Sequence, residues 1–151
     1  MKKNIAIIII TLAIVIAILG LYRSTNQTSS NTPEQSSQNT QYNTPLRAGT
    51  QTIMVEVADT PAKSVLGLSG RTMLNDGTGM IFPIDPPRIV SFWMPDMNFP
   101  IDIIYIKDQQ VVQIFDSVPN HPKDTPRSQL PKYISDQPVD LVLEVPAGCS
   151  Q

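Results

Sequence analysis

The chain of 151 residues begins with an almost unbroken apolar run, from Ile5 to Tyr22. A helix of this length is roughly 27 Å long, close to the thickness of the hydrocarbon layer of a membrane. A polar stretch without a single aliphatic side chain follows, from Ser24 to Pro45. Neither segment can join a globular core, so only about a hundred residues remain for one folded domain.

The apolar run predicts an uncleaved membrane anchor over residues 1–23. The alternative is a cleaved signal peptide, whose apolar core is usually about 7–15 residues long and ends at a small-x-small site. Here the run is longer, has no Ala-x-Ala pattern and is not followed directly by a cysteine for lipoprotein processing. Lys2 and Lys3 precede the run and a single Arg23 follows it, which favours a cytoplasmic N-terminus. We therefore expect a single-pass protein of the cell membrane, with the rest of the chain outside the cytoplasm.

The polar stretch predicts a disordered linker over residues 24–50. Between Ser24 and Pro45, 18 of the 22 residues are Ser, Thr, Asn or Gln. A segment of this composition cannot bury enough apolar surface to fold. Its proposed role is to hold an extracytoplasmic domain, residues 51–151, away from the lipid head groups. That its length has no functional consequence stays an open alternative.

The charges of the remaining chain exclude some partners. The formal net charge of the whole chain is −2, but from Arg47 onward 8 basic residues face 12 acidic ones, a net charge of −4. A domain with this charge is not expected to bind nucleic acid. The single cysteine excludes an internal disulfide and any CxxC site. Because no cluster of histidines or carboxylates has ligand spacing, we also expect no metal and no cofactor.

Beyond residue 50, the pattern predicts an all-β domain with one short helix. Asp59-Thr60-Pro61 is typical of a helix start, and Gly67 of its end. Strands are expected at residues 51–58, 80–82, 89–94, 101–107, 111–118 and 139–145. The proline-rich residues 119–138 are expected to form a long irregular surface loop. Six short strands and one short helix favour a small β-sandwich or barrel rather than a βαβ fold.

Five sequence blocks of the folded part occur in an order that resembles a known family. They are Gly67-Leu68-x-Gly70-Arg71, Gly79-Met80-Ile81-Phe82, Phe92-Trp93-Met94, Phe99-Pro100-Ile101-Asp102 and Leu143-Glu144-Val145-Pro146-Ala147-Gly148. Together they resemble the domain of unknown function 192 family over residues 53–148. The resemblance implies a compact β-sandwich-like fold in proteins that are usually exported or membrane-tethered. It implies no established activity and no catalytic residues.

The sequence departs from the pattern of that family at two places. Pro95-Asp96-Met97 stands where the family commonly has Lys-Asn-Thr, which puts a polar role of this turn in doubt. Family members usually continue beyond Ala147-Gly148 with a further short strand. Here the sequence stops at Gln151, so the resemblance implies either a missing strand or an open sheet edge.

Four residues are candidates for a ligand-binding site: Arg71, Trp93, Asp102 and Glu144. Asp102 lies in an expected strand whose two faces are both largely apolar, and Glu144 poses the same problem in the last strand. Burying a carboxylate is costly unless it is paired or hydrogen-bonded, and Arg71 is an available counter-ion for either acid. With Trp93 as a stacking surface, these residues would line a cleft for a small polar or sugar-like ligand.

A purely structural role for the same residues stays open. Asp102 would then form an ion pair or cap backbone N–H groups of the turn at residues 95–100. Phe92 and Trp93 point to opposite faces of one expected strand, so one of them is expected near solvent. If that residue is Trp93, it is a binding residue; otherwise it belongs to the core.

No catalytic constellation stands out. His121 and Cys149 form the only nucleophile–base pair, but His121 lies in the expected loop and Cys149 is third from the end, so no dyad is expected. The alternative is an envelope hydrolase of glycosidic bonds that uses Asp102 and Glu144 with Arg71. We predict instead a non-enzymatic binding or interaction module. Its expected partners are the membrane, through the N-terminal helix, and a small polar or glycan-like ligand or an envelope protein.

Overall fold

The computed structural model describes residues 42–150. The expected membrane anchor and most of the expected linker lie outside these residues. In residues 42–150, no helix has both the length and the apolar character needed to cross a membrane.

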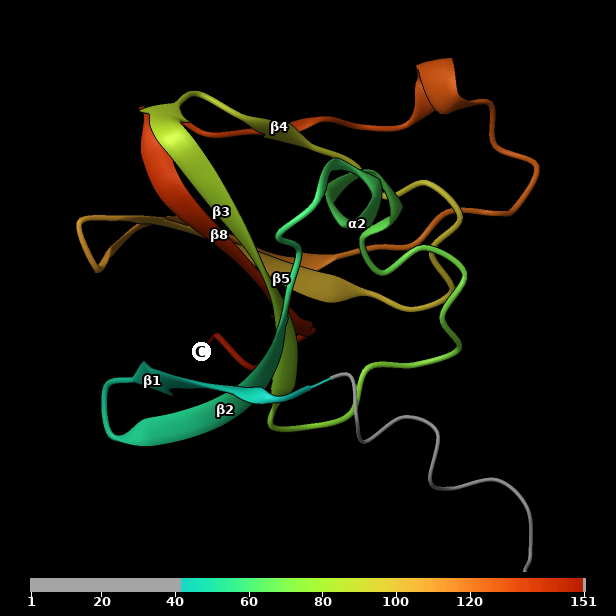
Figure 1. Cartoon of the computed structure of the whole chain (residues 1–151). Helices are drawn as coiled ribbons and strands as arrows, with labels where there is room; N and C mark the ends of the chain where they lie inside the picture. Colours follow the sequence, from blue (N-terminus) through green and yellow to red (C-terminus); the bar gives the residue numbers. More distant parts are fainter. Residues whose placement is uncertain (1–41, 151) are drawn as a thin grey trace, which may run out of the picture. The chain divides into compact units, whose positions relative to one another are not determined.

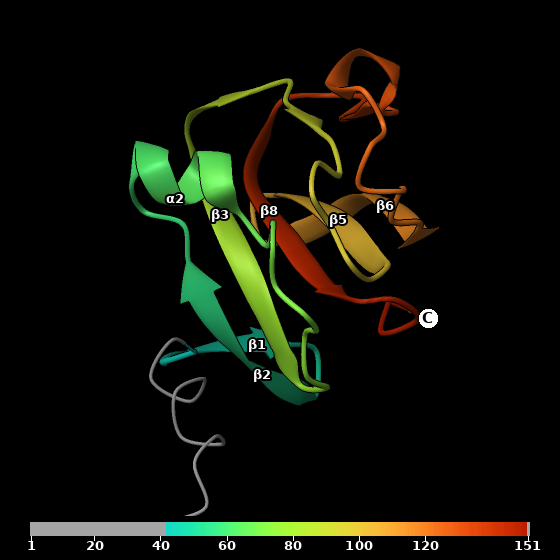
Figure 2. The same ribbon diagram turned by 90° about the vertical axis from the view of Figure 1, so that its right-hand side faces the viewer.

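The described residues form a mainly β domain with one short α-helix, as the sequence predicted. Its elements are β1 (Thr44–Ala48), β2 (Gln51–Val57), α2 (Pro61–Leu66), β3 (Thr78–Arg88), β4 (Ser91–Phe92), β5 (Ile101–Lys107), β6 (Gln110–Val118), the 3₁₀ turn η1 (Arg127–Gln129), β7 (Tyr133–Ile134) and β8 (Val139–Pro146). Six strands make one sheet in the order β1-β2-β3-β8-β5-β6, and β4 pairs with β7 in a second, small sheet. Figure 2 shows β3, β8 and β5 side by side. Since β1 and β6 lie at the two edges, the large sheet is open rather than a closed barrel.

One strand pair corrects the expectation of a fold without a βαβ unit. β2 and β3 run parallel, with Val55 opposite Gly79, while all other pairs of the large sheet are antiparallel. A parallel connection needs a crossover of about a dozen residues or more, and residues 58–77, which include α2, supply it. The direction of a strand relative to its neighbour leaves no mark in its own alternation, so the sequence pattern could not show this.

The short helix α2 begins and ends where the sequence predicted. The side chain of Thr60 accepts a hydrogen bond from the backbone N–H of Lys63 at 3.2 Å, and Pro61 occupies the first turn. Gly67 ends the helix with φ = 52°, a backbone conformation that glycine adopts without strain. None of the residues of α2 itself is buried, so the helix is fixed by its caps and by the chain on either side.

Strand β1 lies within the range expected to be linker. The strand pairs with β2 through a tight turn at Gly49, with Leu46 opposite Ile53. Leu46 is the only large aliphatic side chain of the strand, so the segment shows no apolar alternation that would distinguish it from a linker. The folded domain therefore begins before residue 51, and the predicted linker boundary is corrected to the beginning of β1.

The proline-rich segments are also more ordered than expected. β3 continues to Arg88, with a shift of register against β8 after Pro83. The strand expected at residues 89–94 is reduced to β4, and β4 pairs with β7, which lies inside the expected irregular loop. Proline removes ladder hydrogen bonds but is tolerated where pairing is already interrupted, so these prolines shift the register without ending the strand.

The two faces of the large sheet differ in what packs on them. Buried side chains of one face, which we call the covered face, include Met80, Phe82, Ile103, Tyr105 and Val142. Figure 1 shows α2 and β4 on the same side of β3 and β8, and the packing of Phe92 in this cluster places β4 over the covered face. The opposite face, which we call the open face, carries a smaller aliphatic cluster of Val55, Ile104, Leu143 and Val145.

Contacts between aromatic rings hold the small sheet of β4 and β7 against the covered face. Phe82, Phe92, Tyr105, Phe115 and Tyr133 form four successive edge-to-face contacts, with centroids 5.0, 6.1, 5.9 and 5.3 Å apart. Each such contact contributes about 0.5–1.5 kcal/mol beyond area burial. The hydroxyl of Tyr105 also donates a hydrogen bond to the backbone carbonyl of Tyr133 at 2.7 Å. This chain of rings fixes the position of β4 and therefore of Trp93, which follows it directly.

Candidate functional site

A row of side chains crosses the covered face at the middle of the sheet. The strand register places Glu56 of β2 beside Met80 of β3, and Met80 beside Glu144 of β8. Ile103 of β5 follows on the other side of Glu144. Side chains at paired positions point to the same face, so two acids lie in an otherwise apolar row, separated by Met80.

The first acid, Glu56, is neutralised within the domain. Nη2 of Arg71 lies 2.6 Å from Oε2 of Glu56, and both side chains are mostly buried. Nη1 of Arg71 donates a second hydrogen bond to the hydroxyl of Tyr42 at 2.9 Å, and the guanidinium lies 5.9 Å from the centre of the Tyr42 ring. The sequence predicted Asp102 or Glu144 as the partner of Arg71, and this prediction is wrong: the ion pair is with Glu56.

The second acid, Glu144, has no such partner. Its side chain is buried, with 6 % of the residue exposed. In the described residues no side-chain hydrogen bond or ion pair of Glu144 is present. Burial raises the pKa of Glu144 to about 8, although the positive charge of Arg71 acts in the opposite direction. At neutral pH this carboxyl group is therefore mainly protonated and can both donate and accept a hydrogen bond.

Glu144 lies in a cleft of the covered face, between the chain that follows α2 and the chain that follows β4. The cleft has an empty volume of about 460 Å³, which includes its open mouth. Its lining residues are 64–69, Phe82, 91–95, Met97 and Glu144. The two walls are joined by hydrogen bonds from Ser69 Oγ to the carbonyl of Pro95 and from the N–H of Gly70 to the carbonyl of Asp96, both 2.9 Å long. The usual form of a small-molecule site is a hollow in which apolar side chains surround a few polar groups. This cleft combines Trp93 and other apolar side chains with three serines and Glu144.

Trp93 lies at the mouth of this cleft. The residue is 39 % exposed, whereas its neighbour Phe92 packs into the core against Phe82 and Tyr105. The prediction that one of the two adjacent aromatics lies near solvent is thus confirmed, and the exposed one is Trp93. The guanidinium of Arg127 lies 5.8 Å from the centre of the indole ring, in cation–π range.

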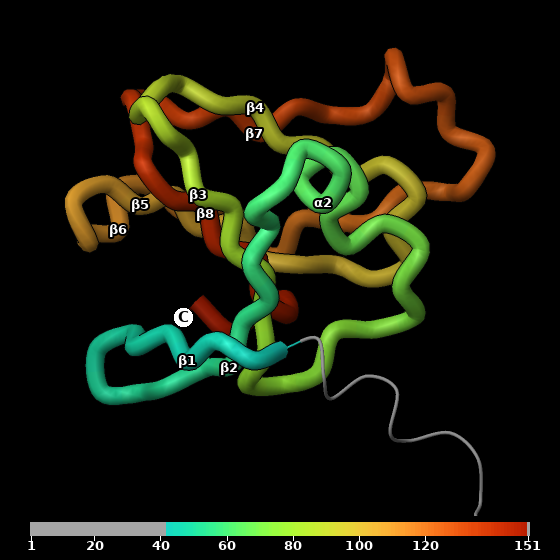
Figure 3. The backbone as a smooth tube through the Cα atoms, in the orientation of Figure 1, coloured from blue at the N-terminus to red at the C-terminus, as the bar shows by residue number. Residues whose placement is uncertain are grey.

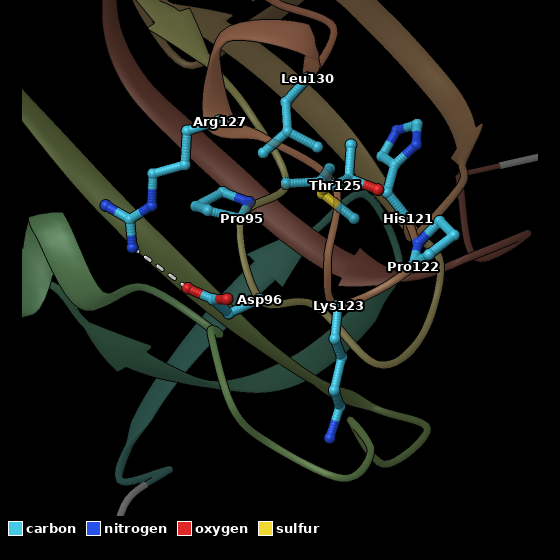
Figure 4. A pocket seen from close by; sticks show the side chains of 9 residues that line it. Pro95, Asp96, His121, Pro122, Lys123, Thr125, Arg127 and Leu130 are labelled. Carbon is cyan, nitrogen blue, oxygen red and sulfur yellow. Dashed lines mark hydrogen bonds and ion pairs between the residues drawn. The ribbon is translucent and has the colours of Figure 1, made fainter.

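Beside the cleft is a smaller hollow around Asp96 (Figure 4), with an empty volume of about 230 Å³. Nη2 of Arg127 lies 3.1 Å from Oδ2 of Asp96, and both side chains are largely exposed, so the pair adds little to stability. Figure 4 shows His121 on the other side of this hollow from Arg127. The backbone of Asp96 has φ = 55°. The Asp96–Arg127 pair thus joins the turn after β4 to the chain around η1.

Asp102 does not belong to the cleft. It pairs with Val145 in the register of β5 and β8, and Val145 is part of the open-face cluster. Its carboxylate is fully buried and accepts hydrogen bonds from the backbone N–H groups of Ser117 at 2.7 Å, Gly148 at 3.1 Å and Ser150 at 2.9 Å. The expectation that Asp102 lies with Trp93 and Glu144 is therefore corrected. A capping role was one of the predicted alternatives, but the donors differ from those predicted in the turn at residues 95–100.

The structure gives no support to a dyad of His121 and Cys149. No hydrogen bond joins them in the described residues. Cys149 is exposed and unpaired. Partial burial and the neighbouring carboxylates of Asp76 and Asp102 raise the pKa of the Cys149 thiol, the opposite of what activates a nucleophile. Across residues 42–150 no three His, Cys, Asp or Glu side chains gather as a metal site, and the absence of a metal stays a prediction.

Of the four residues that the sequence predicted, the structure thus brings Trp93 and Glu144 together in one cleft, with Arg71 near it; that they bind a ligand stays a prediction. The sequence did not identify Glu56 or Tyr42. Glu56 lies on what the alternation shows as the polar face of its strand, and nothing local indicates that Arg71 covers that face. Tyr42 lies within the stretch read as linker. Its position as the only aromatic residue between residues 24 and 45 is the one signal that could have marked it.

Comparisons with known proteins agree with the fold. The model of one family, described as an uncharacterized ACR, matches residues 44–151. A solved structure from Sinorhizobium meliloti 1021, provisionally described as a transcription regulator, is 28 % identical over 69 % of this chain and 78 % of its own, with a TM-score of 0.58. A protein of unknown function from Novosphingobium aromaticivorans DSM 12444 is 24 % identical over 78 % of this chain and 91 % of its own, with a TM-score of 0.59. No curated protein matches the chain.

Proposed function

The chain belongs to the DUF192 family, whose function is unknown, and we propose that it is a membrane-anchored, extracytoplasmic binding module that holds a small, neutral, sugar-like ligand in the Glu144 cleft. The observation that carries the proposal is the carboxyl group of Glu144. It is buried, has no hydrogen-bond or ion-pair partner in the described residues and lines a cleft with an exposed indole ring at its mouth.

The chemistry of the cleft supports a neutral polar ligand with an apolar face. The indole ring of Trp93 and the other apolar side chains of the lining suit the C–H face of a sugar ring. Protonated Glu144 supplies one donor and one acceptor for a ligand hydroxyl group. Because Arg71 is already engaged by Glu56 and Tyr42, it does not offer the cleft a free cation for an anionic ligand.

The alternative, a hydrolase that uses Asp102 and Glu144 together, loses its geometric basis. A pair of catalytic carboxyl groups must flank the bond that is cleaved, about 5–10 Å apart. Here the two side chains belong to opposite faces of the sheet, and the carboxylate of Asp102 is occupied by three backbone donors. A binding function needs only the groups that the cleft contains.

Ligand binding in the cleft can be measured by fluorescence, because Trp93 is the only tryptophan of the chain. We expect one or more members of a panel of neutral mono- and disaccharides and cyclic polyols to shift the tryptophan emission of the full chain in a saturable way. The variant Glu144→Leu, which lacks the hydrogen-bonding group, should weaken binding by about tenfold or more. Glu144→Gln, which keeps a donor and an acceptor, should retain most of the affinity.

The control for this titration is Asp116→Asn, which removes an exposed carboxylate of β6 outside the cleft. It should change the dissociation constant by less than about twofold. A panel that leaves the emission of Trp93 unchanged throughout would contradict the proposed ligand class. Equal binding by wild type and Glu144→Leu would show that the ligand does not use the cleft.

The proposed location rests on the sequence of residues 1–23 and is tested separately. We expect the full chain to remain with the membrane fraction after an alkaline carbonate wash, because an apolar helix of this length stays inserted. Alkaline phosphatase fused after Gln151 should be active, which requires export of the C-terminal domain. Replacing Lys2 and Lys3 with Glu should reduce that activity. Release of a shorter product that begins after the apolar run would instead identify a cleaved signal peptide.

A further inference from the structure

The open face of the sheet carries a second hollow, on the opposite side from the Glu144 cleft. The β1–β2 hairpin and the β5–β6 hairpin both extend to this side (Figure 3), and β8 lies between them in the sheet. The groove between the two hairpins has an empty volume of about 940 Å³, including its open mouth. Its aliphatic lining consists of Leu46, Ile104, Ile106, Val111, Leu141 and Leu143.

The lining of this groove favours a flexible hydrocarbon chain as its occupant. None of the lining residues is aromatic, whereas the centres of protein–protein interfaces are enriched in aromatic side chains and methionine. A peptide would also have to pair its backbone groups in the groove, and the adjacent edge strand β1 contains Pro45, which lacks an N–H donor. An acyl chain needs no hydrogen bonds along its length, and each methylene group that it buries favours binding.

The charge of the groove points to an anionic head group. Arg47 is the only charged residue of the lining, and Gln109 is its only other residue with a long polar side chain. Nε of Arg47 lies 3.4 Å from the carbonyl of Gly49, which leaves the Nη groups of the guanidinium for a ligand. The residues from Arg47 onward carry a net charge of −4, but the lining of this groove contains no acidic residue. The carboxylate of a ligand can therefore pair with Arg47 without repulsion from an acid in the lining.

We propose that the groove of the open face binds one molecule of a free long-chain fatty acid, with its hydrocarbon chain along β8 and its carboxylate at Arg47. A free fatty acid fits better than a diacyl lipid because the groove offers a single cation and one channel between the hairpins. The proposal is independent of the ligand of the Glu144 cleft, since the two sites share no residue.

The test is photolabelling of the full chain in phosphatidylcholine nanodiscs with a palmitic acid that carries a diazirine in the middle of its chain. We expect adducts on peptides of β1, β5, β6 and β8 that an excess of palmitate removes. Uncharged hexadecanol should compete about tenfold less well, because it offers no carboxylate to Arg47. The variant Arg47→Gln should abolish this difference between the two competitors.

A matched pair of variants locates the label. Val111→Glu places a carboxylate at the rim of the groove, and Ile89→Glu places one outside it; the two residues are 58 % and 56 % exposed, so both variants are expected to fold. Labelling of the groove peptides should fall about tenfold in the first and stay unchanged in the second. Equal labelling in both variants would overturn the proposal. The proposal would also be overturned if excess phosphatidylcholine prevented labelling of the groove, because the groove would then bind a membrane lipid. It would likewise be overturned if dimerisation protected the groove from the label, because the groove would then bind a second copy of the chain.

Discussion

Replacing Asp102 with Asn is expected to lower the free energy of unfolding by about 3–5 kcal/mol. The carboxylate is fully buried and accepts three backbone hydrogen bonds, from Ser117, Gly148 and Ser150. Asparagine carries no charge and presents an NH₂ group where one of these donors needs an acceptor. At least one buried N–H group is then left without a partner, and hydrogen bonds to a charged group are among the strongest in proteins.

The same hydrogen bonds predict how the contribution of Asp102 to the free energy of unfolding depends on pH. Burial alone would raise the pKa of Asp102, but the hydrogen bonds from Ser117, Ser150 and Gly148 outweigh it and hold the pKa below its ordinary value of 3.8. The unfolded chain therefore binds a proton at a higher pH than the folded chain does. The stabilisation is present above the ordinary pKa and is lost as the pH falls through the lower pKa of the folded state. In Asp102→Asn, the free energy of unfolding should no longer contain this contribution that is lost at low pH.

Urea unfolding of residues 36–151, the compact unit that contains the domain, measures both effects. Asp116→Asn is the control, because it changes an exposed carboxylate that directly precedes Ser117. Its unfolding free energy should stay within about 0.5 kcal/mol of wild type. If Asp102→Asn is equally stable but no longer binds the ligand of the cleft, Asp102 is a functional residue and its structural role is refuted.

Asp102 also shows how far sequence reasoning reaches in this chain. The alternation of β5 indicated that the carboxylate is buried and must have partners, and both statements are correct. The partners were not predictable, because two of the three donors lie 46 and 48 residues further along the chain. They reach Asp102 only because β8 pairs with β5 and the chain turns back after Pro146. The local sequence pattern shows that a buried polar group needs hydrogen-bond partners, whereas the topology of the sheet decides which residues supply them.

The same distinction explains the errors around Arg71. The sequence indicated that an arginine after the helix would neutralise a buried acid, and it does. The acid is Glu56 because the parallel pairing of β2 with β3 places this residue, rather than Glu144, within reach of the guanidinium. Strand β1 and Tyr42 were missed for a related reason. Their contribution to folding comes from pairing with β2 and from contact with Arg71, not from any apolar pattern of their own.

The second large effect on stability is expected from Glu144. The stability linked to this residue decreases as the pH rises, whereas the stability linked to Asp102 decreases as the pH falls. Burial raises the pKa of Glu144 in the folded state to about 8, from an ordinary value of 4.5, against the effect of Arg71. Between these two values the folded chain binds a proton that the unfolded chain has released. The stability linked to Glu144 is therefore fully present below about pH 4.5 and decreases as the pH rises to about 8, by about 3–5 kcal/mol in total.

Glu144→Gln should remove this decrease, because the amide stays neutral throughout the range and keeps the shape of the side chain. Above pH 8 the variant should be more stable than wild type, which no loss of a structural contact would produce. The measurement is urea unfolding of residues 36–151 at intervals from pH 5 to 9. His121→Asn is the control, since it changes a side chain that does not line the cleft; this variant should keep the decrease.

The pH dependence also connects stability to the proposed function. Only the protonated carboxyl group of Glu144 can donate a hydrogen bond to a neutral ligand, so the affinity of the cleft should fall as the pH rises through about 8. In Glu144→Gln the affinity should be independent of pH over the same range. A wild-type affinity that increases with pH would mean that the ligand binds the ionised carboxylate and is a cation. The neutral, sugar-like ligand class would then be wrong, while the cleft itself would remain the binding site.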